Sequence, residues 1–168
     1  MKTTLLTIAF AIATLIVSAQ SIELDATTGK YQVQAVEELS SNLSKDELFT
    51  KAKQWIALNY KSANDVIQLA DQENGKIICR GNFSTNLFMK KGWIEHTMIL
   101  DFKDGKMRYT FTDFVYTSPG SGDYPFESKW AKGYRTKAHA ETEANVKGSV
   151  ASLKDYLAGT AAASDNDW

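Results

Sequence analysis

The chain has 168 residues, of which 19 are basic and 20 are acidic, and its formal net charge is −1. A nearly neutral chain has no long-range attraction for nucleic acid or for an anionic membrane, so neither is expected as a partner. Cys79 is the only cysteine, which excludes an intramolecular disulfide, so a chain of this length depends on one hydrophobic core.

Residues 1–19 have the pattern of a cleavable export signal. Lys2 gives a positive start, an apolar run follows over residues 5–17, and Val17-Ser18-Ala19 places small residues where a signal peptidase cuts. The apolar run is shorter than the roughly 20 residues that span a bilayer. We therefore expect cleavage after Ala19, an exported protein in the periplasm or outside the cell, and no membrane insertion of the mature chain.

Two segments after the signal differ in their periodicity. Residues 31–35 alternate between apolar and polar side chains, which is typical of a half-buried strand. Ser44 and Glu47 have the spacing of a capping box, which predicts a helix over residues 45–60. The apolar side chains on one stripe of this helix are Leu48, Ala52, Trp55 and Ile56.

Residues 93–117 predict a β-hairpin that turns at Asp104-Gly105, a dipeptide that accepts positive φ at both positions. With Lys103 opposite Lys106, one face of the hairpin is apolar along most of its length. At the open end this register pairs His96 with Asp113, Ile94 with Val115, and Trp93 with Tyr116. We expect this hairpin to form the centre of the sheet.

A second hairpin is predicted over residues 64–83, with a turn at Asn74-Gly75. Its register stays open, because both faces of both strands carry apolar residues. Gly81 lies within the second of these strands and suggests a bulge or the close approach of another group.

The C-terminal part contains a turn-rich connection, an irregular aromatic segment and a helix. The connection covers residues 118–123, and the aromatic segment covers residues 124–135. Apolar residues at helical spacing predict a helix over residues 138–157. Residues 158–168 are small and acidic and are expected to form a flexible tail. A single domain over residues 30–157 follows.

Several motifs carry a resemblance to a known family: Lys51-Ala52-Lys53-Gln54-Trp55, Asp65-Val66-Ile67-Gln68, Glu73-Asn74-Gly75-Lys76-Ile77-Ile78 and Lys103-Asp104-Gly105-Lys106-Met107-Arg108-Tyr109-Thr110. Over about residues 31–117 the chain resembles a bacterial family of exported proteins, a domain of unknown function with a TATA-binding-protein-like (TBP-like) fold. The resemblance supplies no catalytic or ligand residues.

The predicted order is strand, helix, four strands and helix. Consecutive hairpins make the sheet antiparallel, and two amphipathic helices can cover only one of its faces. The expected fold is therefore α+β, with an antiparallel sheet of about five strands and two helices on one face, TBP-like or helix-grip-like. A DNA-binding TATA saddle needs two such repeats and basic flanks, whereas this slightly acidic chain has length for one repeat.

His96 opposite Asp113 is the best candidate for a catalytic pair, because a carboxylate can orient an imidazole as a general base. The alternative is a structural hydrogen bond at the end of the hairpin. No nucleophile is identifiable, so no residue is assigned a catalytic role. His139 and Glu143 lack further ligands, so no metal site or cofactor is expected. Cys79 is expected to be a small buried hydrophobe.

Four aromatic residues form the candidate binding site: Trp93, Tyr116, Trp130 and Tyr134. One interpretation is an exposed aromatic strip that binds a carbohydrate, a peptide or a partner protein. The other is a small core, in which the irregular segment folds back over the sheet and buries them.

The sequence favours a non-catalytic exported domain, a binding or interaction module of the bacterial envelope with an unknown protein or small-molecule partner. The alternatives are a carrier of a small apolar ligand and a hydrolase that uses His96 and Asp113. A carrier predicts missing core volume, and an enzyme predicts a cleft at the open end of the hairpin.

Overall fold

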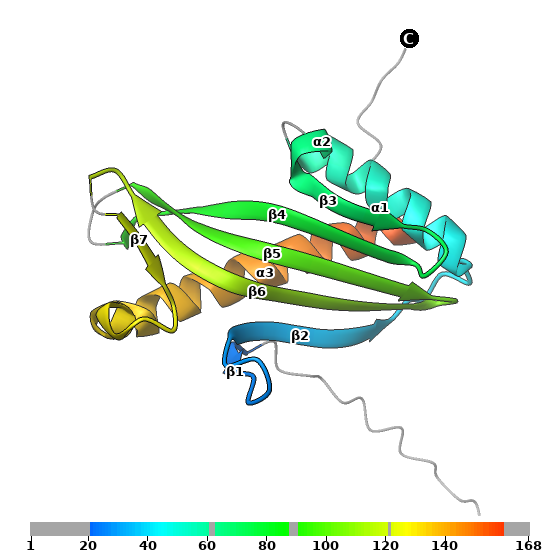
Figure 1. Cartoon of the computed structure of the whole chain (residues 1–168). Helices are drawn as coiled ribbons and strands as arrows, with labels where there is room; N and C mark the ends of the chain where they lie inside the picture. Colours follow the sequence, from blue (N-terminus) through cyan, green and yellow to red (C-terminus); the bar gives the residue numbers. More distant parts are fainter. Residues whose placement is uncertain (1–20, 61–62, 88–90, 121, 160–168) are drawn as a thin grey trace, which may run out of the picture.

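The computed structural model describes residues 21–60, 63–87, 91–120 and 122–159. Within these residues a seven-stranded antiparallel sheet is backed by two long helices on one face (Figure 1). The α+β class predicted from the sequence is therefore confirmed, with more strands than the five expected. None of the described helices is long and apolar enough to cross a membrane.

The strands are β1 (Glu23–Leu24), β2 (Tyr31–Glu38), β3 (Ile67–Asp71), β4 (Lys76–Thr85), β5 (Gly92–Lys103), β6 (Lys106–Ser118) and β7 (Gly122–Pro125). The helices are α1 (Lys45–Asn59), the short α2 (Ala63–Val66), the 3-10 helix η2 (Lys129–Gly133) and α3 (Arg135–Ala158). Across the sheet the strand order is β1-β2-β6-β5-β4-β3, and β7 pairs with the far end of β6. The short strands β1 and β7 were not predicted, because each has too few residues to show a period.

The central hairpin has the predicted register along most of its length. Lys103 pairs with Lys106 and Leu100 with Tyr109, and the match continues to Thr97 opposite Thr112. Alternate side chains of β5 and β6 therefore enter the core, since successive residues of a strand point to opposite faces. One face of the sheet is covered by α1 and α3, and we call it the helix face. We call the opposite face the open face.

A β-bulge at the open end of the hairpin contradicts the predicted register there. Asp113 and Phe114 together oppose His96, and beyond them Glu95 pairs with Val115. Asp113 has φ 56°, a conformation that Asp adopts more readily than most residues. The extra residue moves every following side chain of β6 to the other face, so Phe114 points into the core instead of away from it.

Helix α1 begins as predicted, with Ser44 and Glu47 forming the capping box. Its stripe of Leu48, Ala52, Trp55 and Ile56 is buried. Helix α3 is three residues longer at its start than predicted, and it runs behind the sheet along its length (Figure 1). The apolar residues that α3 buries in the core are Ala138, Val146, Val150, Leu153 and Leu157.

The second hairpin forms between β3 and β4, with Asp71 opposite Lys76. Residues 64–66, which were predicted at the start of this hairpin, belong to α2 instead. Gly81 marks a close approach, as expected, because an added Cβ would lie 3.0 Å from Nε2 of His96 and 3.1 Å from the Tyr60 ring. Gly81 is therefore required by the packing of these two rings.

Candidate functional site

His96 lies inside the core and not beside a carboxylate. Its ring stacks on Phe83 with ring centroids 4.1 Å apart, and Phe111 lies at 5.3 Å. Nδ1 lies 3.4 Å from the carbonyl of Ile94, whereas the buried Nε2 has no partner among the described residues. Burial lowers the pKa of His96 to about 4, because the interior disfavours the charged imidazolium. The ring is therefore neutral at ordinary pH.

The predicted pair of His96 and Asp113 is wrong, and the bulge is the reason. The Asp113 side chain is about half exposed and lies 3.6 Å from Nζ of Lys30. The imidazole and the carboxylate thus belong to opposite faces of the sheet. The structural hydrogen bond between them, which was the alternative, is absent for the same reason.

Two of the four candidate aromatic residues are buried together. The rings of Tyr116 and Tyr134 have centroids 5.3 Å apart, and the Tyr134 hydroxyl donates to the carbonyl of Tyr124. The predicted pair of Trp93 and Tyr116 is wrong, because Trp93 pairs with Thr117 and Tyr116 with Ile94 after the bulge. This arrangement favours a small aromatic core over an exposed strip. The side chain of Trp130 lies outside the described residues.

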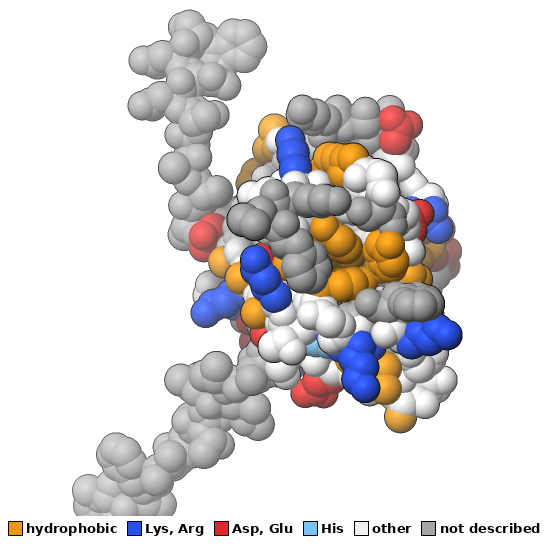
Figure 2. Space-filling view, turned by 90° about the vertical axis from the view of Figure 1, so that its left-hand side faces the viewer, with side chains coloured by type: hydrophobic (Ala, Val, Ile, Leu, Met, Phe, Trp, Pro, Cys, Tyr) orange, Lys and Arg blue, Asp and Glu red, His pale blue; other side chains and the backbone are white. Residues whose placement is uncertain are grey.

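Trp93 itself is half-buried and belongs to the open face, as do Glu95 and Thr97 on the same strand. Figure 2 shows the end of the molecule to which the first residues of β5 and the strand β7 belong. Hydrophobic side chains gather near the middle of this view, and Lys and Arg side chains surround them. A binding role of Trp93 stays a prediction.

The remaining reactive groups are packed into the fold. His139 lies between the rings of Tyr31 and Phe126, so it is not on a solvated helix face. Glu143 accepts from the amide of Ile22. Cys79 is buried as expected, and burial raises the pKa of its thiol to about 12. Among the described residues, no three His, Cys, Asp or Glu side chains are grouped to hold a metal ion.

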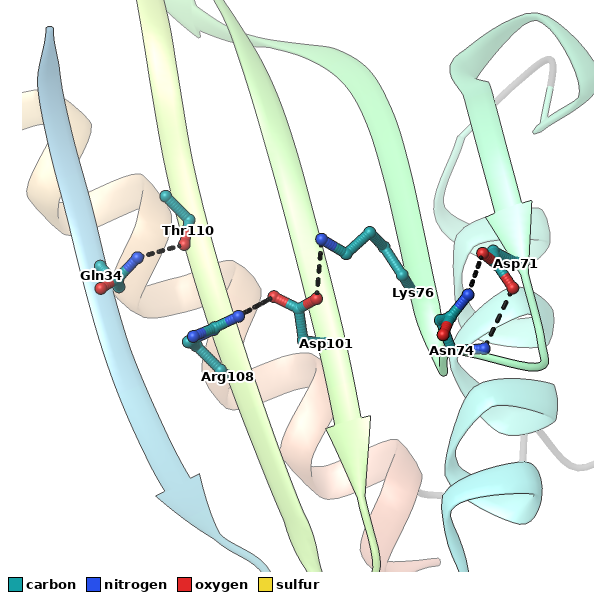
Figure 3. A network of polar contacts seen from close by, with 7 residues as sticks. All are labelled: Gln34, Asp71, Asn74, Lys76, Asp101, Arg108 and Thr110. Atoms are coloured by element: carbon teal, nitrogen blue, oxygen red, sulfur yellow. Dashed lines mark hydrogen bonds and ion pairs between the residues drawn. The ribbon is translucent and has the colours of Figure 1, made fainter. Parts of the chain in front are cut away.

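The open face is divided into two halves. In the half nearest the turns, Asp101 accepts from Arg108 at 2.9 Å and lies 3.2 Å from Nζ of Lys76, which links three strands (Figure 3). Two separate polar pairs lie near this group: Gln34 with Thr110, and Asn74 with Asp71. The polar groups of this half satisfy one another, so we call it the paired half.

The other half of the open face surrounds the bulge. Apart from the ion pair between Asp113 and Lys30, its polar side chains are not joined to one another among the described residues. Arg80, Asn82 and Glu95 are exposed. Within the described part of the chain, neither Arg80 nor Glu95 forms an ion pair, and none of the three side chains forms a hydrogen bond. They line a depression of about 500 Å³. Its complete lining is Arg80, Gly81, Asn82, Glu95, His96, Thr97, Asp113 and Val115. We call this region the unpaired half.

A second depression, of about 390 Å³, lies on the helix face between α1 and α3. The two helices touch where Nε1 of Trp55 donates to Ser152 at 3.1 Å. On the β4 side the depression is bounded by Asn82 and Phe83. Its lining is Trp55, Asn59, Tyr60, Asn82, Phe83, Ala144, Asn145, Gly148, Ser149 and Ser152.

Sequence reasoning did not select Arg80, Asn82 or Glu95. One signal for the bulge was present, since the apolar positions of β6 change phase between Phe111 and Phe114. A phase change of one residue in a strand is the mark of a bulge. No pattern in the sequence indicates that Arg80 lacks an ion-pair partner, because this depends on which strands become neighbours in the sheet.

Comparisons with known proteins agree with this fold. Residues 39–117 match the family model described as "Domain of unknown function (DUF4468) with TBP-like fold". No curated protein matches the chain.

Two solved structures are similar to the chain. A TBP-like protein from Parabacteroides distasonis has a TM-score of 0.66 and 17% identity, over 80% of this chain and 96% of that one. A DUF4468 family protein from Bacteroides ovatus has a TM-score of 0.61 and 15% identity, over 82% and 91% of the respective chains. At these identities the likeness shows the fold alone. The resemblance suggested by the sequence is thus confirmed: residues 39–117 match the DUF4468 family of domains of unknown function, and the chain has the TBP-like fold.

Proposed function

We propose that the protein is an exported, non-catalytic binding module of the bacterial envelope, and that it binds its partner through the unpaired half of the open face. The observation that supports this proposal is the contrast between the two halves. Asp101 and its neighbours satisfy one another, whereas Arg80 and Glu95 have charges of opposite sign and no partner among the described residues. Such groups give specificity to a partner with complementary charges.

The hydrolase hypothesis loses the residue pair on which it depended, because His96 is buried among aromatic rings and Asp113 faces Lys30. A binding role requires no reactive group. It requires an accessible surface whose polar groups can form hydrogen bonds or ion pairs with a partner, and the exposed side chains of Arg80, Asn82 and Glu95 provide such a surface.

Carboxylate labelling with a carbodiimide and glycine ethyl ester tests this proposal. The protein is labelled once in an intact envelope preparation and once after purification, and each site is quantified by mass spectrometry. We expect Glu95 to react several-fold less in the envelope, because a partner covers it. Asp46 on α1, whose side chain is 62% exposed, is the control and should react equally. Equal labelling of Glu95 in both samples would contradict the proposal.

Export is tested separately by the N-terminus of the protein. Protein taken from the exported fraction should begin at Gln20, since the small residues Val17 and Ala19 direct cleavage after Ala19. N-terminal sequencing or an intact mass gives the answer. A protein that retains Met1 and stays in the cytoplasmic fraction would show that it is not exported by this signal.

A further inference from the structure

Half of strand β4 is a sheet edge. β3 pairs with Lys76–Cys79, and no strand of the described chain pairs with residues 80–85 on that side. In Figure 1, β3 lies alongside only one half of β4, and the other half forms the margin of the sheet. The register of β4 with β5 is unbroken from Lys76 to Thr85. A regular strand edge without proline or a bulge is a template for another strand.

The two depressions lie on opposite faces of this edge and meet at one residue. Asn82 lines both the depression on the open face and the one between α1 and α3. Arg80 borders only the first, and Phe83 borders only the second. A strand added beside residues 80–85 would place successive side chains alternately on these two faces, because side chains alternate along a strand.

We propose that the edge of β4 binds an extended peptide segment of a partner protein by strand addition. The backbone of the peptide pairs with residues 80–85, and its alternate side chains occupy the two depressions. This mode gives affinity through the main chain and specificity through the pockets. The inference rests on the proposed function, since it names the class of partner and the way in which it is bound.

The lining of each depression indicates the chemistry of the peptide. The depression on the open face is lined by one cation, Arg80, and two carboxylates, Glu95 and Asp113, of which Asp113 is paired with Lys30. Arg80 is the only charged residue of the edge segment 80–85, so an acidic residue of the peptide is favoured directly beside it. On the helix face, Trp55, Tyr60 and Phe83 provide aromatic surface, while Gly148 leaves room above it. An apolar residue of the peptide fits there. The expected ligand therefore alternates apolar and acidic or polar residues.

A second copy of this chain fits the edge less well. The helix-facing side chain of β4 at Phe83 is already stacked on His96 in its own core. It cannot also fill the depression of a neighbouring copy. Pairing of two β4 edges would therefore leave both helix-face depressions empty.

The probe is a seven-residue peptide with blocked ends, in which valine alternates with threonine and glutamate. It is titrated into the mature protein and followed by amide chemical shifts and sedimentation. We expect saturable shifts at residues 80–85 and around both depressions, with the protein remaining a monomer. Replacing the central valine of the peptide by proline should abolish the shifts, because proline removes a backbone donor.

Two variants test the two depressions. Gly148→Leu fills the space between the helices, where an added Cβ meets nothing within 4 Å, and should weaken binding at least tenfold. Lys147→Leu, one position along on the exposed surface of α3, is the matched control and should leave binding unchanged. Arg80→Glu should weaken binding about fivefold, as expected for one exposed ion pair.

The proposal is overturned if millimolar peptide produces no shifts at residues 80–85, or if Gly148→Leu binds as well as the original chain. A dimer joined through β4 would replace the peptide by a second copy and overturn it as well. These failures are distinct from a failure of the proposed function. Protection of Glu95 in the envelope without peptide binding would retain a binding module and remove strand addition.

Discussion

Asp113 decides which side chains the central hairpin presents on each face. Its positive φ allows β6 to accommodate one extra residue, after which Phe114 and Tyr116 turn into the core. The carboxylate itself points toward Lys30. His96 is left facing aromatic rings, and its ionisation is governed by burial alone apart from the carbonyl of Ile94.

Replacing the carboxylate therefore tests the separation of these two residues. Asp113→Asn should leave the pKa of His96 unchanged, because the Asp113 side chain lies on the opposite face of the sheet. An NMR titration of the His96 ring protons measures this. A pKa that falls in the variant would mean that the two groups interact after all.

The depressed pKa of His96 also predicts how stability depends on pH. Between about pH 6.5 and 4 the unfolded chain binds a proton at His96 and the folded chain does not. His96 therefore does not lower the free energy of unfolding above pH 6.5. As the pH decreases from 6.5 to 4, protonation of His96 in the unfolded chain lowers the free energy of unfolding by about 3 kcal/mol. Urea unfolding across this range gives the slope. His96→Leu should flatten it, and an equal slope in the variant would contradict this origin.

At the scale of elements, the turn of the central hairpin is joined to the start of α1. Oδ1 of Asp104 accepts from the amide of Lys45 at 2.7 Å, and the amide of Gly105 donates to the carbonyl of Leu43. Asp104 thus forms part of the turn, and its carboxylate also accepts a hydrogen bond from an amide at the N-terminus of α1, where a negative charge is favourable. This contact fixes α1 against the sheet.

Two variants test the hydrogen bond that Asp104 accepts from Lys45. Asp104→Ala removes the acceptor and should lower the free energy of unfolding by about 1 kcal/mol or somewhat more, the usual cost of a lost N-terminal cap. Asp104→Asn keeps both an acceptor and a residue suited to the turn, so it should cost much less. Denaturant unfolding distinguishes them. Equal losses in the two variants would contradict this account, because only the negative charge of Asp104 is lost in both.

The elements that the sequence predicted well are those whose signal is local. The capping box at Ser44, the turn at Asp104-Gly105 and the stripe of α3 all depend on near neighbours, and all are present. The prediction of a catalytic pair was wrong because the regular register of the hairpin ends at Thr112, and a shift of one residue beyond it exchanges the faces. The short strands β1 and β7 and the edge of β4 depend on pairing between distant parts of the chain. The periodicity of a single segment does not predict such pairing.

At the scale of the whole molecule, α1 and α3 cover one face of the sheet and leave the other open (Figure 1). The polar side chains of the paired half are joined in ion pairs and hydrogen bonds, whereas the unpaired half lies beside the part of β4 that β3 does not pair with. The proposed binding site therefore depends on where neighbouring strands end in the sheet, and no sequence motif marks it.

Amide hydrogen exchange of the purified mature protein tests the central claim, the free edge of β4, most directly. In residues 80–85 the amides that point away from β5 should exchange with an opening free energy near zero. Those that point toward β5, and those of Lys76–Cys79 that β3 covers, should be protected up to the global unfolding free energy. This alternation would establish an edge that is available for another strand. Uniform protection of residues 80–85 would show that the edge is already covered and would contradict the account.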